Sequence, residues 1–173
     1  MGRAISVQSK QGVGATFTVA IETDCVREET VRLQSVRENA ASVCASLRGR
    51  HILLCEDHPL NQEIASALLQ EKQIQVTTAE NGQSGVDLFK RSSLGFYDAV
   101  LMDIRMPVMD GYEATRQIRA LGRPDAAVVP IIAMTADAFV DDVQKCFEAG
   151  MNGHMAKPID PDVLFVELAK LIK

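Results

Sequence analysis

The sequence predicts an α/β protein with a five-stranded parallel sheet, preceded by a β-hairpin. Two observations predict the sheet: five short apolar runs recur between residues 51 and 157, and segments with helical spacing separate them. Strands that alternate with helices form parallel sheets with helices on both faces. The third observation is an alternation of apolar and polar residues within residues 1–22, on both sides of a glycine-containing turn, which predicts the hairpin.

The hairpin comes first along the chain. Its expected strands are "ISVQS" and "ATFTVAIE", joined by the turn "KQGVG". A two-stranded hairpin is marginally stable in water, so we expect it to pack on other structure. Residues 23–50 follow; they are polar, lack proline and carry only a thin apolar stripe. This composition predicts a linker with partial helical character.

The five predicted strands of the sheet are the runs "HILLC", "IQVTTA", "YDAVLMD", "VVPIIAMT" and "GHMAK". Helical spacing lies between them, as in Leu60, Ile64 and Leu68 after the first run. Because right-handed crossovers connect parallel strands, few topologies are compatible with this order of elements.

Composition and charge exclude several classes of function. The net charge of −5 and the lack of a basic stripe argue against a nucleic-acid surface. Apolar runs fall short of the ~20 residues that a membrane helix needs. The four cysteines are far apart and form no Cys-x-x-Cys pair, which indicates reduced thiols and a cytoplasmic location.

Polar residues follow four of the five predicted strands. They are Glu56 and Asp57, then Asp103, then Thr135, then Lys157. Ligands of open parallel sheets bind at the carboxyl ends of the strands. Three carboxylates there would repel one another unless a cation lay among them, and oxygen ligands favour Mg²⁺. A lysine and a threonine beside such an ion suit the oxygens of a phosphoryl group.

The stretches "LLCEDHPLNQEIA", "VLMDIRMPVMDG", "IIAMTADA" and "HMAKPI" resemble the receiver domain of two-component signalling, particularly the receiver fused to hybrid sensor histidine kinases. The resemblance covers about residues 51–173. It implies a flavodoxin-like (βα)5 fold with strand order 2-1-3-4-5. It also implies a phosphorelay function, in which a kinase phosphohistidine donates a phosphoryl group and a histidine phosphotransfer protein or domain accepts it.

The resemblance assigns roles to individual residues. Asp103 would be the phosphoacceptor, and Thr135 and Lys157 would bind the phosphoryl oxygens. Mg²⁺, or Mn²⁺, would be held by Asp57 and Asp103 directly, by Glu56 largely through water, and by the backbone carbonyl of Arg105. The Lys157–Pro158 peptide bond is expected to be cis. Asn61 faces the acidic residues from the start of the next helix and is interpreted as a cap.

Three residues depart from the usual family pattern or modulate it. His154 stands where many members carry a tyrosine or phenylalanine that moves inward with the threonine, so this chain departs from the family pattern at the aromatic-switch position. Arg105 and Asp137 lie two residues after the acceptor and the threonine, where family side chains control water access. Because they carry opposite charges, one hypothesis is that they pair and slow hydrolysis; the other is that both point into solvent, where such a pair contributes only ~0 to 1 kcal/mol.

Residues 1–22 resemble the last two strands of a histidine kinase ATP-binding domain. The chain contains nothing like the phosphorylatable histidine helix or the Asp-x-Gly-x-Gly loop of such a kinase. We therefore expect a C-terminal portion of a hybrid kinase, whose parent is compatible with anchoring in a bacterial inner membrane. As an enzyme, this portion would catalyse only its own phosphotransfer and dephosphorylation.

Two other functions are compatible with an acid at the end of a strand. A Mg²⁺-dependent aspartyl-phosphate phosphohydrolase needs a second aspartate two residues after its nucleophile, and Arg105 stands there. A flavin-binding module on the same sheet would bring its phosphate to the loop "EDHPLN", whose acids would repel it.

Overall fold

The computed structural model describes residues 3–10, 14–21, 46–136 and 140–172, which belong to two separate units. The first unit contains the predicted hairpin. Strand β1 (Arg3–Lys10) pairs with β2 (Gly14–Ile21) in antiparallel register, with Arg3 opposite Ile21 and Lys10 opposite Gly14. The alternation of apolar and polar residues therefore predicted this element correctly.

The second unit is built on a five-stranded parallel sheet. Its strands are β3 (His51–Cys55), β4 (Gln75–Ala79), β5 (Ala99–Asp103), β6 (Ile131–Thr135) and β7 (Gly153–Ala156), in the spatial order β4-β3-β5-β6-β7. Numbered within this unit, the order is 2-1-3-4-5, which confirms the flavodoxin-like topology. The central strand β5 is paired on both sides, and all five of its residues are buried.

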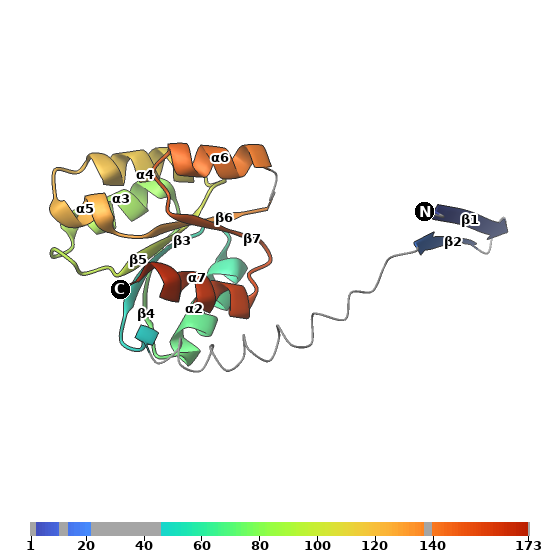
Figure 1. Ribbon diagram of the computed structural model, residues 1–173, viewed down its shortest axis with the longest axis horizontal. Coiled ribbons are helices and arrows are strands. Elements are labelled where there is room, and N and C mark those ends of the chain that lie inside the picture. Colours follow the sequence, from blue (N-terminus) through green and yellow to red (C-terminus); the bar gives the residue numbers. More distant parts are fainter. Residues whose placement is uncertain (1–2, 11–13, 22–45, 137–139, 173) are drawn as a thin grey trace. The chain divides into compact units, whose positions relative to one another are not determined.

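Helices cover both faces of the sheet (Figure 1). On one face lie α2 (Pro59–Glu71) and α7 (Pro161–Leu171); on the other lie α3 (Gly82–Arg91), α4 (Gly111–Ala120), α5 (Pro124–Val128) and α6 (Val140–Glu148). Each face has its own apolar core, one including Leu69 and Leu164 and the other including Phe89 and Ile118. Among the described helices, none is both long and apolar enough to cross a bilayer.

Helix α2 turns a different side to the sheet than its most apolar residues suggest. Ala65 and Leu69 are buried, whereas the side chains of Leu60 and Ile64 are 56% and 48% exposed. Helical spacing predicts the helix but does not say which of two apolar stripes packs inward. The small Ala65 lets the helix approach the sheet, and it leaves Leu60 and Ile64 on the surface.

Two boundaries differ from the predicted ones. The predicted fourth strand began at Val128, but this residue ends α5, and β6 begins only at Ile131. Residues 46–50, which fall in the predicted linker, contact the sheet unit: Leu47 is buried in the core, and the Arg50 guanidinium pairs with Asp98 at 2.7 Å. The rest of the predicted linker, 23–45, lies outside the described residues.

Arg123 joins α5 to the C-terminal end of α3. Its guanidinium donates hydrogen bonds to the backbone carbonyls of Phe89, Lys90, Ser92 and Ser93, and it lies 4.9 Å from the centre of the Phe89 ring. A cation at this position satisfies carbonyls that have no partner within the helix. Asp125 holds the same guanidinium at 2.7 Å.

Candidate functional site

The carboxyl ends of the strands bring together the polar residues predicted for the site. Asp103 is the last residue of β5 and lies opposite Met134 of β6, next to Thr135. Glu56 and Asp57 follow β3, the other neighbour of β5, and Lys157 follows β7. Because all five strands are parallel, these side chains share one edge of the sheet.

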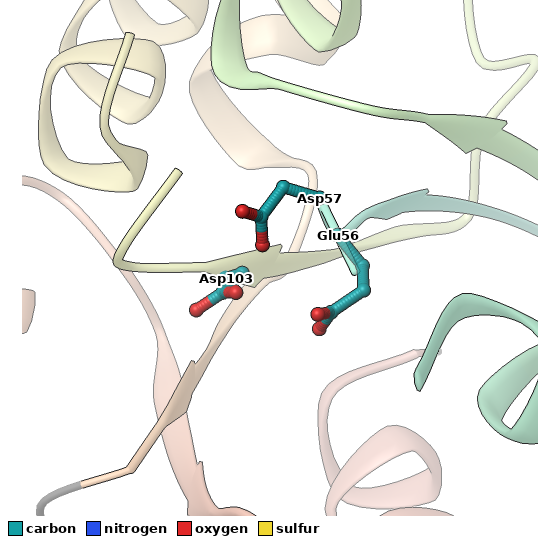
Figure 2. Close-up of side chains that lie close together, drawn as sticks. All are labelled: Glu56, Asp57 and Asp103. Atoms are coloured by element: carbon teal, nitrogen blue, oxygen red, sulfur yellow. The ribbon is translucent and has the colours of Figure 1, made fainter. Parts of the chain in front are cut away.

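Three carboxylates form the centre of the site. Oxygen atoms of Glu56, Asp57 and Asp103 lie within 4.8 Å of one another. Figure 2 shows the three side chains close together. Glu56 and Asp103 are only 1% and 5% exposed, and Asp57 is exposed. Oxygen donors in this number and spacing suit a hard divalent cation, which would reduce the repulsion among the three acids.

Lys157 is the cation that the site itself supplies. Its Nζ lies 2.6 Å from Asp103 Oδ2 and 2.6 Å from Glu56 Oε2. Burial opposes the charged lysine, but the hydrogen bonds and charges of the two carboxylates outweigh burial and raise the pKa of Lys157. One ammonium thus pairs with two buried carboxylates and balances the charge of only one of them. A second cation would balance the remaining negative charge.

Asp103 itself is held in a recessed, partly desolvated position. Burial raises the pKa of Asp103, while hydrogen bonds from Lys157 and from the Arg105 backbone amide act in the opposite direction. The Arg105 amide donates to Asp103 Oδ1 at 3.1 Å, and Lys157 occupies Oδ2. Both oxygens of the carboxylate are therefore fixed in direction, as suits a nucleophile.

The start of α2 orients Glu56. Asn61 Nδ2 donates to Glu56 Oε1 at 3.0 Å, and Gln62 Nε2 donates to the Glu56 carbonyl at 3.2 Å. The interpretation of Asn61 as a helix cap is therefore wrong: His58 is the N-cap residue, without a side-chain hydrogen bond, and Asn61 instead positions an acid of the site. Sequence reasoning missed Gln62 because its contact is to a backbone atom.

Two pockets open beside the carboxylates. One, of about 230 Å³, is lined by Ile104, Arg105, Asp110, Tyr112 and Thr135. The other, of about 100 Å³, is lined by Glu56, Asn61, Ile64, Lys157, Pro158 and Ile159. Tyr112 is a lining residue that sequence reasoning missed, since it lies beyond the motif that contains Asp103.

The loop between β5 and α4 turns sharply next to Asp103. The Gly111 amide donates to the Ile104 carbonyl at 3.0 Å, and a Cβ at Gly111 would collide with the Asp103 carbonyl oxygen. Within the loop, the Met109 amide donates to the Pro107 carbonyl at 2.7 Å. This hydrogen bond closes a three-residue γ-turn, and its central residue, Val108, has φ +68°.

Three further predicted residues are Pro158, which lines the pocket that Glu56 and Lys157 also line, His154 and Asp137. The Lys157–Pro158 peptide bond is cis, as expected. His154 is half-buried on β7, and its ring lies 6.5 Å from that of Phe147 on α6 in an edge-on arrangement. Asp137 lies outside the described residues, so its pairing with Arg105 stays a prediction.

Known proteins match the sheet unit. The sensor histidine kinase RcsC of Salmonella typhimurium is 36% identical over 118 residues, which are 68% of this chain and 12% of RcsC. Hybrid signal transduction histidine kinase I of Dictyostelium discoideum is 37% identical over 117 residues, 66% of this chain and 7% of that protein. The chain spans between 7% and 16% of the length of the first curated relatives that it matches.

Two solved structures of receiver domains are similar to this chain. The receiver domain of sensor histidine kinase PA1611 from Pseudomonas aeruginosa PAO1, which has a magnesium ion in its active-site cleft, is 44% identical with a TM-score of 0.65. It covers 72% of this chain and 98% of that domain. The receiver domain of Ssk1, crystallised with the histidine phosphotransfer protein Ypd1 of Saccharomyces cerevisiae, is 29% identical with a TM-score of 0.66, over 73% of this chain and 90% of that one.

A family model decides the assignment. The model described as "Response regulator receiver domain" matches residues 52–169, which include every acid of the site and all five strands of the sheet apart from His51, the first residue of β3. With the topology β4-β3-β5-β6-β7 and the carboxylate cluster at its open edge, the chain belongs to the family of response regulator receiver domains of two-component signalling.

Proposed function

We propose that Asp103 is the residue of this receiver that accepts the phosphoryl group. One observation carries the proposal: a buried carboxylate at the end of the central strand, 2.6 Å from an ammonium and within 4.8 Å of two more carboxylates. This arrangement combines a fixed nucleophile with charges that stabilise an incoming phosphoryl group.

The transfer is a substitution at phosphorus. A carboxylate oxygen of Asp103 forms the new O–P bond, the N–P bond of the donor phosphohistidine breaks, and its electron pair stays on the imidazole nitrogen. Lys157 then pairs with a phosphoryl oxygen, and the Thr135 hydroxyl, beside Asp103 in the sheet, donates to another.

The oxygen donors at this edge fit a magnesium ion. Asp57 and Asp103 would hold Mg²⁺, or Mn²⁺, directly, with Glu56 through water and the Arg105 carbonyl as a further ligand. When bound, the ion neutralises charge between the carboxylates and the phosphoryl oxygens. Glu56, fixed by Asn61, keeps its carboxylate directed at this position before an ion arrives.

Arg105 and the acidic loop disfavour the two alternative functions. A phosphohydrolase of the aspartyl-phosphate type needs a general acid where Arg105 provides a guanidinium, which cannot donate a proton to a leaving group at neutral pH. A flavin phosphate would meet Glu56 and Asp57 at the end of β3.

We propose a relay between histidines as the biological role. The chain would be the receiver of a hybrid sensor histidine kinase, with 1–22 from the ATP-binding domain, 23–50 as linker and 51–173 as receiver, on the cytoplasmic side of the membrane. Its relatives named as hybrid histidine kinases support this layout. A kinase phosphohistidine would be the donor and a histidine phosphotransfer protein the acceptor, as the Ssk1–Ypd1 complex suggests by analogy.

Surface chemistry supports a protein partner at the site. Leu60 and Ile64 of α2 are exposed apolar residues, and Ile64 also lines the pocket that contains Lys157.

Modulation of the acyl phosphate is assigned to Arg105 and Asp137, and propagation of the change at Thr135 would involve His154 without an aromatic switch. The lifetime of phospho-Asp103 in Arg105→Ala and Asp137→Ala tests the first assignment, because unchanged lifetimes in both would exclude it.

Intact mass measurement tests the central proposal. The chain is incubated with acetyl phosphate, with and without Mg²⁺; we expect one phosphoryl adduct that requires the metal. Asp103→Asn should abolish the adduct, and Asp162→Asn, which changes an exposed acid in the first turn of α7, should leave it intact. An adduct that persists in Asp103→Asn would refute the assignment.

A further inference from the structure

Strand β4 is an outer strand of the sheet, and one of its sides is unpaired. In the order β4-β3-β5-β6-β7 it has, among the described residues, a neighbour only at β3. Natural proteins protect such edges with charged side chains, proline, bulges or very short strands. The sequence of β4, "QVTTA", has no charge and no proline, and its register with β3 is continuous over all five residues. This edge therefore lacks the usual protection against pairing with another strand.

The hydrogen bonds to the β3 side show which backbone groups of β4 point outward. The Gln75 amide donates to that side at 2.8 Å, and the Ala79 carbonyl accepts from it at 3.0 Å. Successive residues of a strand direct their amides and carbonyls to opposite sides, so Thr77 also faces β3. Val76 and Thr78 face away from β3, and their amides and carbonyls are the groups to which a further strand would bind.

Opposite charges lie at the two ends of this edge. Glu80 follows β4 directly and is exposed. At the other end, the Gly49 amide donates to the Gln73 carbonyl at 2.9 Å, which brings the exposed Arg48 close to the start of β4. Neither Arg48 nor Glu80 has an ion-pair partner among the described residues. The edge is thus basic where β4 begins and acidic where it ends.

We propose that the β4 edge binds the same edge of a second copy of this chain, in antiparallel register with Thr77 on the two-fold axis. Val76 of each copy then lies opposite Thr78 of the other, and all the outward amides and carbonyls of these residues are paired. Both are β-branched, as suits cross-strand neighbours. The contact is isologous and closes after two copies.

Charge selects this direction of pairing. In the antiparallel register Glu80 of one copy lies opposite Ile74 of the other, one residue from Gln73 and therefore near Arg48. A parallel register would place Arg48 beside Arg48 and Glu80 beside Glu80, and like charges in such positions are destabilising. The contact between two short strands is small, so the dimer is a weak one.

The antiparallel arrangement also keeps the contact away from the acidic site. Asp103 lies at the carboxyl ends of the strands, and the strands of the two copies run in opposite directions. The acidic sites are therefore at opposite ends of the joined sheet, and neither copy covers the other's site. We expect self-association to be independent of the phosphoacceptor reaction, so the proposal does not depend on the proposed function.

Sedimentation of the full chain between about 10 µM and 1 mM tests the contact. We expect a monomer–dimer equilibrium. Thr78→Pro removes an outward amide and no hydrogen bond to β3, and proline is tolerated at such edge positions. It should raise the dissociation constant about tenfold or more. Thr78→Ala, which keeps the amide, is the matched control and should stay within about threefold of the parent. Urea unfolding of each variant verifies that it folds.

A charge exchange tests the register without altering the backbone. Arg48→Glu and Glu80→Arg should each raise the dissociation constant about fivefold, because each reversal creates two like-charge contacts in the dimer. The double variant Arg48→Glu/Glu80→Arg should return to within about twofold of the parent. Arg91→Glu changes an exposed arginine at the end of α3 and should have no effect.

Three results would overturn the proposal. A parent chain that stays monomeric over the whole concentration range would exclude the dimer. A double charge variant that associates no better than the single reversals would exclude the register. A dimer that persists unchanged in Thr78→Pro and in both reversals would place the contact elsewhere on the chain.

Discussion

Replacing Lys157 with methionine should strongly destabilise the receiver when no divalent cation is present. Methionine keeps an apolar stem of the same number of heavy atoms as that of lysine, and it removes the ammonium that lies 2.6 Å from both Glu56 and Asp103. Charged oxygens of these two acids, within 4.8 Å of each other, would then face one another unpaired. At an effective dielectric constant of ~20, their repulsion is about 3 kcal/mol. Breaking a buried ion pair by removing one partner costs a similar amount.

Urea unfolding at pH 8 with a chelator measures this loss. We expect the free energy of unfolding to fall by about 3 kcal/mol, which moves the midpoint by roughly 2 M for a domain of this size. Lys170→Met is the matched control, because Lys170 pairs with Glu167 at the same 2.6 Å on the exposed side of α7. An exposed pair contributes ~0 to 1 kcal/mol, so this variant should stay near the parent.

The double variant Lys157→Met/Asp103→Asn examines the cause. Neutralising Asp103 removes the repulsion, so about 2 kcal/mol of the loss should be recovered. A Lys157→Met chain as stable as the Lys170→Met control, or a double variant no more stable than Lys157→Met, would refute the electrostatic reasoning.

Two further predictions concern packing and pH. Gly85→Ala should cost about 1 to 3 kcal/mol in urea unfolding, because the new Cβ would lie 2.5 Å from Cys55 Sγ. In a Cys55→Ala background the nearest remaining atom is Cβ at 3.8 Å, so the same substitution should cost less than about 1 kcal/mol there; equal costs in both backgrounds would contradict the contact. The hydrogen bond from Arg123 lowers the pKa of Asp125 from 3.8 to about 2. The ionised Asp125 carboxylate therefore makes its full contribution to the free energy of unfolding above about pH 4, and this contribution is lost as the pH falls through about 2. Asp125→Asn should flatten this part of the pH profile of thermal unfolding, by about 1 kcal/mol for a surface pair; a profile identical to that of the parent would exclude the pair as the cause.

The fold could be predicted from the sequence because the spacing of apolar residues differs between the strands and the helices. Continuous apolar runs such as Ala99–Met102 predicted buried parallel strands, and alternation before residue 22 predicted the hairpin. The residues at the strand ends were predictable for the same reason: once the strands are parallel, Asp103, Thr135 and Lys157 must share an edge.

Other features depend on contacts between residues distant along the chain, which no local pattern encodes. Arg123 binds carbonyls some thirty residues away in the chain, so its role at the end of α3 was invisible in the sequence. The outward side of α2 was equally hidden, because Leu60 and Ile64 fit a helical stripe as well as the buried Ala65 and Leu69 do. The left-handed conformation of Val108 was unexpected because valine does not favour it.

The central position of β5 has a consequence for how long a signal can persist. Local opening of a domain begins at edges and ends, and a strand paired on both sides and buried along its whole length opens only with the entire sheet. Asp103, the proposed phosphoacceptor, is therefore attached to the slowest-opening part of the receiver. Fraying of α2 or α7 would leave Asp103 in place. The lifetime of the phosphorylated state would then be set by hydrolysis of the acyl phosphate rather than by local unfolding of the domain.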